Sequence, residues 1–109
     1  MSLDVYLVVT KPTEVYESNI THNLNLMARE VSEDFYKTLW RPEELNLTTA
    51  EQLIPMLTAG LNTLLSDPER FKKFNPSNGW GSYERLVEFV DHYLHACKET
   101  PNAEVRASR

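Results

Sequence analysis

A strand-like segment at the N-terminus constrains the fold of this chain more than any other feature. Apolar residues stand at positions 3, 5, 7 and 9, and this period of two, rich in valine, predicts a β-strand. Tyr6 and Val8 are also apolar, so we expect the strand to be partly covered on its second face, as a central strand is. Lys11-Pro12-Thr13 breaks it, and the short, β-prone segment 14–17 is a candidate second strand.

Later segments show helical spacing. Ile20, Leu24, Met27 and Val31 are separated by four, three and four residues, which places them on one stripe of a helix. Each expected helix begins at a residue suited to cap its N-terminus. From cap to end they run from Ser18 or Asn19 to Val31, from Ser32 to Arg41-Pro42, from Thr48 to Leu65, from Asp67 to Phe74, and from Ser82 to Thr100. In the third, Glu51 would complete a capping box with Thr48. Residues 103–108 then alternate as an edge strand does, and most simply pair with the N-terminal strand.

These elements predict an α+β architecture in a single domain over residues 1–109. A small sheet of two or three strands, formed by the N- and C-terminal strands, is expected to be covered by four or five helices. In the third helix, Gly60 either weakens the helix or permits a neighbour to pack closely.

Composition narrows the classes of partner. Eleven Lys and Arg against 16 Asp and Glu give a net charge of −5, so no direct nucleic-acid binding is expected. No apolar run is long enough for a membrane span, and the N-terminus lacks the basic start of a signal peptide. A single cysteine, Cys97, fits a reducing compartment, and we expect a cytoplasmic protein.

Two segments carry polar groups that suit a ligand. Asn19, His22 and Asn23 crowd the first turn of the predicted first helix, where free backbone N–H groups favour an anionic or strongly polar molecule. Alternatively, they cap the helix. At Trp40-Arg41, an indole beside a guanidinium can stack on a ring and pair with a phosphate or carboxylate. The alternative is a core tryptophan with Arg41 bonded to a local acid such as Glu43 or Glu44.

The third candidate is the loop Asn78-Gly79-Trp80-Gly81-Ser82-Tyr83. Glycines allow positive φ and close approach of the backbone, so this loop can aim Trp80 at a ligand. The alternative is a tryptophan that plugs the core. Asn78, Trp80 and Tyr83 therefore join the candidate ligand-binding residues. Spacing alone does not show whether the three segments converge on one concavity.

Histidines near the C-terminus invite a metal interpretation that the spacing does not favour. His92 lies off the buried stripe of the last helix and Cys97 lies on it, so a shared tetrahedral site is strained. We expect no metal and no cofactor.

Segments spread over nearly the whole chain carry a family resemblance. They are Met1-Ser2-Leu3-Asp4-Val5-Tyr6-Leu7, Asn19-Ile20-Thr21-His22-Asn23-Leu24, Leu39-Trp40-Arg41-Pro42-Glu43, residues 74–83, and Ala103-Glu104-Val105-Arg106-Ala107-Ser108-Arg109. The chain resembles a family of small, uncharacterised proteins encoded by bacteriophages and prophages. The resemblance implies a protein made in the host cytoplasm, of a kind that often counters host defence.

Three functions follow from these patterns. The first is a non-enzymatic protein that binds and sequesters a small polar or anionic ligand, such as a nucleotide derivative. The second is a protein–protein inhibitor of a host defence factor, or a homodimer, which Leu26 on the polar side of the first helix would favour. The third is a small hydrolase or transferase with His22 as base, which requires a carboxylate to orient the imidazole.

Overall fold

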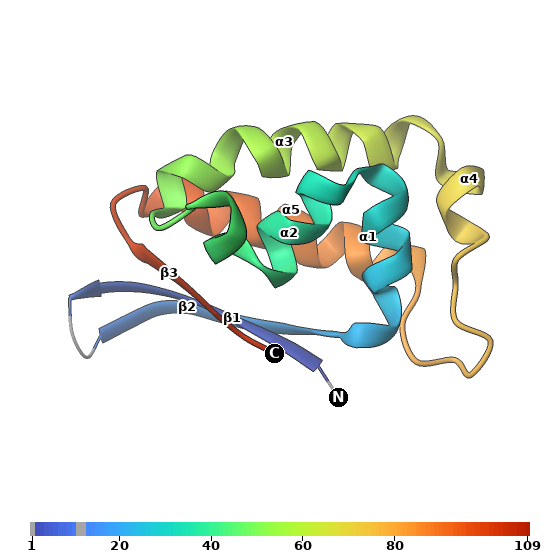
Figure 1. Ribbon diagram of the computed structural model, residues 1–109, viewed down its shortest axis with the longest axis horizontal. Helices are drawn as coiled ribbons and strands as arrows, with labels where there is room; N and C mark the ends of the chain where they lie inside the picture. Colours follow the sequence, from blue (N-terminus) through green and yellow to red (C-terminus); the bar gives the residue numbers. More distant parts are fainter. Residues whose placement is uncertain (1, 11–12) are drawn as a thin grey trace.

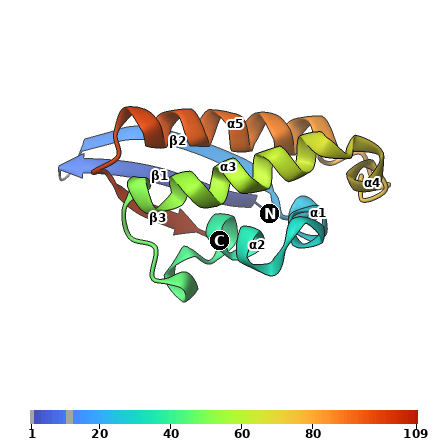
Figure 2. The ribbon, with the colours of Figure 1, turned by 90° about the horizontal axis from the view of Figure 1, so that it is seen from above.

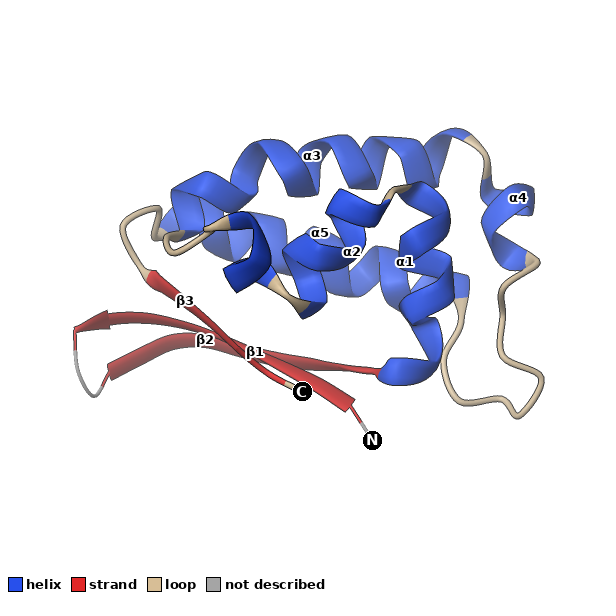
Figure 3. Ribbon diagram, in the orientation of Figure 1, coloured by secondary structure: helices blue, strands red, loops and turns tan. Residues whose placement is uncertain are grey.

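A small antiparallel sheet forms one layer of the molecule, and helices cover one of its two faces (Figure 1; Figure 3). The computed structural model describes residues 2–10 and 13–109; Lys11 and Pro12, where a strand break is predicted, lie outside them. The strands are β1 (Ser2–Thr10), β2 (Thr13–Thr21) and β3 (Glu104–Ser108), in the order β2-β1-β3. The N-terminal strand is therefore central, and the predicted α+β fold with its paired terminal strands is confirmed.

Helices account for most of the remaining chain. They are the 3₁₀ helices η1 (His22–Leu24) and η2 (Pro42–Leu45) and the α-helices α1 (Asn25–Val31), α2 (Glu33–Trp40), α3 (Ala50–Ser66), α4 (Pro68–Lys72) and α5 (Tyr83–Glu99). The two long helices, α3 and α5, run side by side above the sheet, and α1 and α2 lie beside α3 (Figure 2).

The inner face of the sheet forms the floor of the core. Leu3, Val5 and Leu7 of β1 are fully buried, as the alternation predicts. The alternation fails at Val9, which is exposed, whereas Val8 is buried. The reason is a shift in the β1–β2 register after Leu7, since an irregular register changes which side chains face the core.

The predicted first helix is wrong at its start. Residues 18–21 continue β2, and the α-helix begins only at Asn25, after the single turn of η1. Ile20 is buried in the sheet opposite Leu3, while Leu24 and Met27 are buried from the helical segments. The apolar stripe thus spans a strand and two helices, because both kinds of element turn these residues toward one core.

The predicted caps are mostly confirmed. Ser32, Asp67 and Ser82 accept hydrogen bonds from the backbone N–H three residues on, at 2.9, 3.4 and 3.1 Å. The capping box of α3 is displaced by one residue from the prediction: Thr49 is the cap and Gln52, not Glu51, completes it. The backbone of Thr48 is instead bonded to β3, where its carbonyl accepts from Val105 N–H at 2.9 Å.

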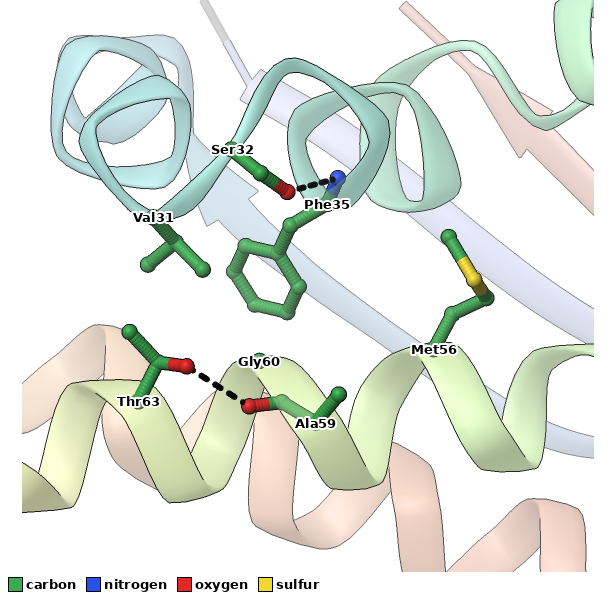
Figure 4. Close-up of a pocket in the computed structure, with 7 residues that line it drawn as sticks. All are labelled: Val31, Ser32, Phe35, Met56, Ala59, Gly60 and Thr63. Atoms are coloured by element: carbon green, nitrogen blue, oxygen red, sulfur yellow. Dashed lines mark hydrogen bonds between the residues drawn. The ribbon is translucent and has the colours of Figure 1, made fainter.

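Close packing of α2 on α3 explains Gly60. The Phe35 ring of α2 lies directly on the Gly60 backbone, and a Cβ atom at this position would overlap the ring (Figure 4). A hollow of about 170 Å³ opens beside the ring, lined also by Val31, Ser32, Met56, Ala59 and Thr63. Of the two predicted roles for Gly60, the structure shows the close approach.

Candidate functional site

A hollow of about 610 Å³ lies where the outer face of the sheet meets the loop between α4 and α5. Its lining residues are Ser2, Asn19, Thr21, Asn23, Asn78 and Trp80. They come from the start of β1, the end of β2, η1 and the loop. Two of the three predicted segments, Asn19–Asn23 and Asn78–Tyr83, therefore meet at one concavity.

The strands supply the floor of the hollow. Thr21 pairs with Ser2 across the β1–β2 ladder, and Asn19 lies two residues earlier on β2. Because Ile20 between them points into the core, Asn19 and Thr21 both point to the outer face of the sheet. The pleat of β2 thus places hydroxyl and amide groups side by side at the sheet's uncovered surface.

A glycine brings the loop against this floor. Gly81 has φ of +104°, and a Cβ atom there would lie 2.7 Å from the Thr21 methyl group and 3.0 Å from Leu24. Only a residue without a side chain allows both this conformation and this approach. The end of the loop therefore lies against β2 and η1 (Figure 1).

Hydrogen bonds shape the loop around Trp80. The Asn78 side-chain oxygen accepts from Trp80 N–H at 2.9 Å, which is an Asx turn, and Asn75 accepts from Tyr83 N–H at 2.8 Å. The Trp80 side chain is 69% exposed, so it does not plug the core. An indole held at the surface beside an open polar hollow is available to a ligand.

The hollow is lined by uncharged groups. Amide and hydroxyl side chains can both donate and accept hydrogen bonds. The nearest cation shown by the contacts is Arg85 of α5, which donates to the Asn19 carbonyl at 2.7 Å and lies 3.5 Å from Glu88. The expected helix N-terminus at Asn19 is wrong, because Asn19 belongs to β2, while His22 and Asn23 lie in the single turn of η1.

The half-buried His22 and the buried Trp40 lie together and do not line the hollow. The Trp40 indole N–H donates to His22 Nδ1 at 3.1 Å, so the neutral imidazole carries its proton on Nε2. Trp40 is 1% exposed and stacks on Tyr36, with ring centroids 5.6 Å apart. A buried indole has no face for a ligand, and the expectation of stacking on Trp40 is corrected to a core tryptophan.

Arg41 and Tyr83 also serve the fold. Arg41 lies 3.5 Å from Glu44, as its alternative interpretation expects, and hydrogen-bonds to the Tyr36 hydroxyl. Burial raises the pKa of Tyr36, but Arg29 and Arg41 outweigh this effect and lower it. Tyr83 is buried, and its hydroxyl donates to the Leu64 carbonyl at 2.7 Å, which joins α5 to α3.

Four of the eight predicted site residues line the hollow, namely Asn19, Asn23, Asn78 and Trp80. Ser2 and Thr21 were not predicted as lining residues. Both residues could have been predicted from the alternation of polar and apolar residues along the strands, since Ser2 precedes Leu3 and Thr21 follows Ile20. The helical interpretation of residues 18–21 hides this alternation.

The imidazole of His95 and the thiol of Cys97, two other chemically reactive side chains, lie outside the hollow. His95 Nδ1 lies 2.8 Å from the Asp91 carbonyl, and burial raises the pKa of the Cys97 thiol to about 12. Within residues 2–10 and 13–109, no three His, Cys, Asp or Glu side chains gather closely enough to hold a metal ion.

None of the helices in the described parts of the chain is long and apolar enough to cross a membrane.

Comparisons with known proteins assign neither a family nor a function to the chain. No protein-family model, curated protein or solved structure matches the chain.

Proposed function

We propose that the protein is a non-enzymatic binding protein that takes a small polar ligand into the hollow beside Trp80. The observation that carries this proposal is the pairing of a 69% exposed indole with a hollow of about 610 Å³ lined by uncharged hydrogen-bonding groups. Ligand sites combine an apolar or aromatic wall with a few polar groups that fix orientation. Trp80 provides the wall, and Asn19, Asn23 and Asn78 provide the polar groups.

The lining favours a ligand that contains a ring and uncharged polar groups. The indole face stacks on a flat ring, and amides bond to hydroxyl, amide or ring-nitrogen groups. A nucleoside, or the nucleoside part of a nucleotide derivative, has both features, and so has a sugar. A phosphate on such a ligand would extend away from the lining residues, since none of them is cationic.

The surroundings of His22 argue against the hydrolase alternative. A general base needs a free lone pair that faces the substrate. At His22, Nδ1 already accepts from Trp40, and Nε2 is buried without a hydrogen-bond partner among residues 2–10 and 13–109. The orienting partner is an indole and not a carboxylate.

The resemblance to small phage and prophage proteins supports a role for this binding inside an infected host cell. A protein that holds a nucleotide derivative without converting it would withhold that molecule from a host defence system. The proposed role is therefore sequestration in the cytoplasm of the host cell.

Tryptophan fluorescence tests the proposal. Stacking on the exposed Trp80 should quench emission when the protein is titrated with a panel of nucleosides, nucleotides and monosaccharides. We expect a saturable change with one class of the panel. Trp80→Ala should abolish it, and Leu26→Ala, at a residue 60% exposed but outside the lining, should leave it unchanged. No saturable change with any compound, or an equal change in Trp80→Ala, would contradict the proposal.

A matched pair of amide substitutions tests the polar wall. Asn19→Ala removes one lining amide, which we expect to weaken binding about fivefold to tenfold for one lost hydrogen bond. Asn62→Ala removes an exposed amide on α3 and should have no effect. Equal affinities in the two variants would place the ligand elsewhere.

A further inference from the structure

β2 forms one edge of the sheet, because no strand in the described part of the chain pairs with its far side. The strand order β2-β1-β3 leaves one side of β2 without a neighbouring strand over residues Thr13–Thr21. The unpaired N–H and C=O groups of an edge strand are a template for another extended chain. Two questions decide whether this edge is usable: which backbone groups point outward, and what lies beside them.

The contact of Arg85 settles the direction of the backbone groups. Arg85 belongs to α5, and its guanidinium donates to the Asn19 carbonyl at 2.7 Å, so this carbonyl points away from β1. In an antiparallel strand both polar groups of a residue point to one side, and every second residue repeats the direction. The N–H and C=O of Glu17 therefore point outward too, together with the N–H of Asn19.

The far edge of the sheet confirms this alternation. Asn19 is paired with Asp4, and Glu17 with Tyr6, at positions where β1 turns its own polar groups toward β3. Val105, next to the partner of Tyr6 on β3, should then point outward. It does, because its N–H donates to the Thr48 carbonyl at 2.9 Å.

A groove runs between the edge of β2 and helix α5. It has a volume of about 230 Å³, enough for one side chain. Its lining residues are Val15, Tyr16, His92, His95, Ala96, Glu99 and Thr100. A strand added to β2 would place alternate side chains over the outer face of the sheet and into this groove.

One carboxylate lies on β2 and another at the groove. Glu17 on the outer face and Glu99 at the groove's rim form no ion pair with any residue in the described part of the chain. The other edge differs in charge, since Glu104 lies 2.7 Å from Arg106 on β3. On each edge one outward backbone group is already bonded, the Asn19 carbonyl to Arg85 and the Val105 N–H to Thr48. The carboxylates of Glu17 and Glu99, unpaired within residues 2–10 and 13–109, favour a basic partner at this edge.

A second copy of the chain fits this edge poorly. Two β2 strands paired about their outward groups in the middle of the strand would bring Glu17 opposite Glu17, and like charges directly opposite destabilise a sheet. An extended segment of a different protein, with a basic residue at that position, reverses the sign of the interaction.

We propose that the free edge of β2 binds an extended basic segment of a partner protein by strand addition. A Lys or Arg of the segment lies opposite Glu17 on the outer face. The residue next to it enters the groove with a medium-sized apolar side chain, and a second basic residue reaches Glu99. Backbone bonds to Glu17 supply affinity, and the charges supply selectivity.

Selection from a random decapeptide library on beads tests this proposal. We expect enrichment of sequences in which a Lys or Arg stands next to a medium-sized apolar residue, with a second Lys or Arg at an odd spacing from the first. A fluorescein-labelled enriched peptide should lose affinity about tenfold with Glu17→Lys. Glu51→Lys, the same change at an exposed residue of α3, should retain it. No enrichment, or enrichment of acidic peptides, would overturn the proposal.

The backbone contact is tested separately by hydrogen exchange in the intact protein. On addition of the enriched peptide, the outward amide of Glu17 should exchange more slowly by at least about tenfold, while that of Ser18, which faces β1, should change little. Glu17→Pro removes the outward donor but no ladder bond, so the variant should stay folded and bind weakly. Unchanged exchange at Glu17 would show that the peptide binds elsewhere.

Discussion

Substitution of Gly60 by alanine tests how the two helical layers are packed. A methyl group at this position overlaps the Phe35 ring, which is 2% exposed and packed on the helix backbone. Two effects oppose each other. Alanine stabilises a helix interior by about 1 kcal/mol relative to glycine, whereas an extra carbon forced into a filled core costs about 1–3 kcal/mol.

The structure indicates that the steric cost exceeds the helical gain. Relief requires the Phe35 ring to move into the neighbouring hollow of about 170 Å³, which is open and would expose part of the ring. The overlap involves Cδ1 and Cε1 on one edge of the Phe35 ring and leaves Cγ, which lies on the ring axis, at only 2.9 Å, so a rotation about that axis relieves it only in part. Because the overlap is severe, the steric cost should lie in the upper part of its range, at about 2–3 kcal/mol, and Gly60→Ala should destabilise the protein by about 1–2 kcal/mol in total.

Urea denaturation followed by circular dichroism measures this effect. The midpoint should fall with an unchanged slope, and Tm should fall by about 4–8 °C for each kcal/mol. Gly60→Ala combined with Phe35→Leu should be less destabilised than the sum of the two single variants, because the smaller side chain removes the overlap. A Gly60→Ala protein as stable as wild type or more so would refute the packing argument.

Other substitutions test the internal contacts. Trp40→Phe leaves His22 Nδ1 without its donor and should cost about 1–3 kcal/mol by urea denaturation. Gly81→Ala, at φ of +104° and against β2, should lower Tm more than Gly79→Ala, at φ of +79° with open space around it. Burial raises the pKa of Cys97 from 9.0 to about 12, so the folded thiol should resist Ellman's reagent at pH 8. Its contribution to the free energy of unfolding should be full below pH 9 and decline as pH rises toward 12, because only the unfolded thiol ionises in that range.

Local patterns predicted the elements of the fold better than their boundaries. The caps at Ser32, Asp67 and Ser82 depend on residues three positions apart, so their signal is contained in the sequence. The end of β2 depends on pairing with β1, which joins Ile20 to Leu3 across the sheet. Because Ile20 also fits a helical stripe, only that long-range contact decides between helix and strand.

In the candidate site too, local sequence predicts some features and long-range contacts decide the others. Asn19 was placed on the correct side for an incorrect reason, since a polar residue beside the buried Ile20 points outward in a strand as well as in a helix. The turn residues around Trp80 marked the loop from composition alone. His22 was misplaced because its partner, Trp40, lies 18 residues away and no local spacing reveals that bond.

Native mass spectrometry of the protein purified from cells tests the central claim most directly. We predict a discrete added mass on the wild-type chain that denaturation removes, that Trp80→Ala loses, and that Leu26→Ala retains. Its mass would identify the ligand as a nucleoside, nucleotide or sugar. Should the added mass persist in Trp80→Ala, the ligand would lie outside the hollow. A chain without any added mass, which also fails to take up members of the ligand panel in the spectrometer, would contradict the assignment of a binding function to the hollow.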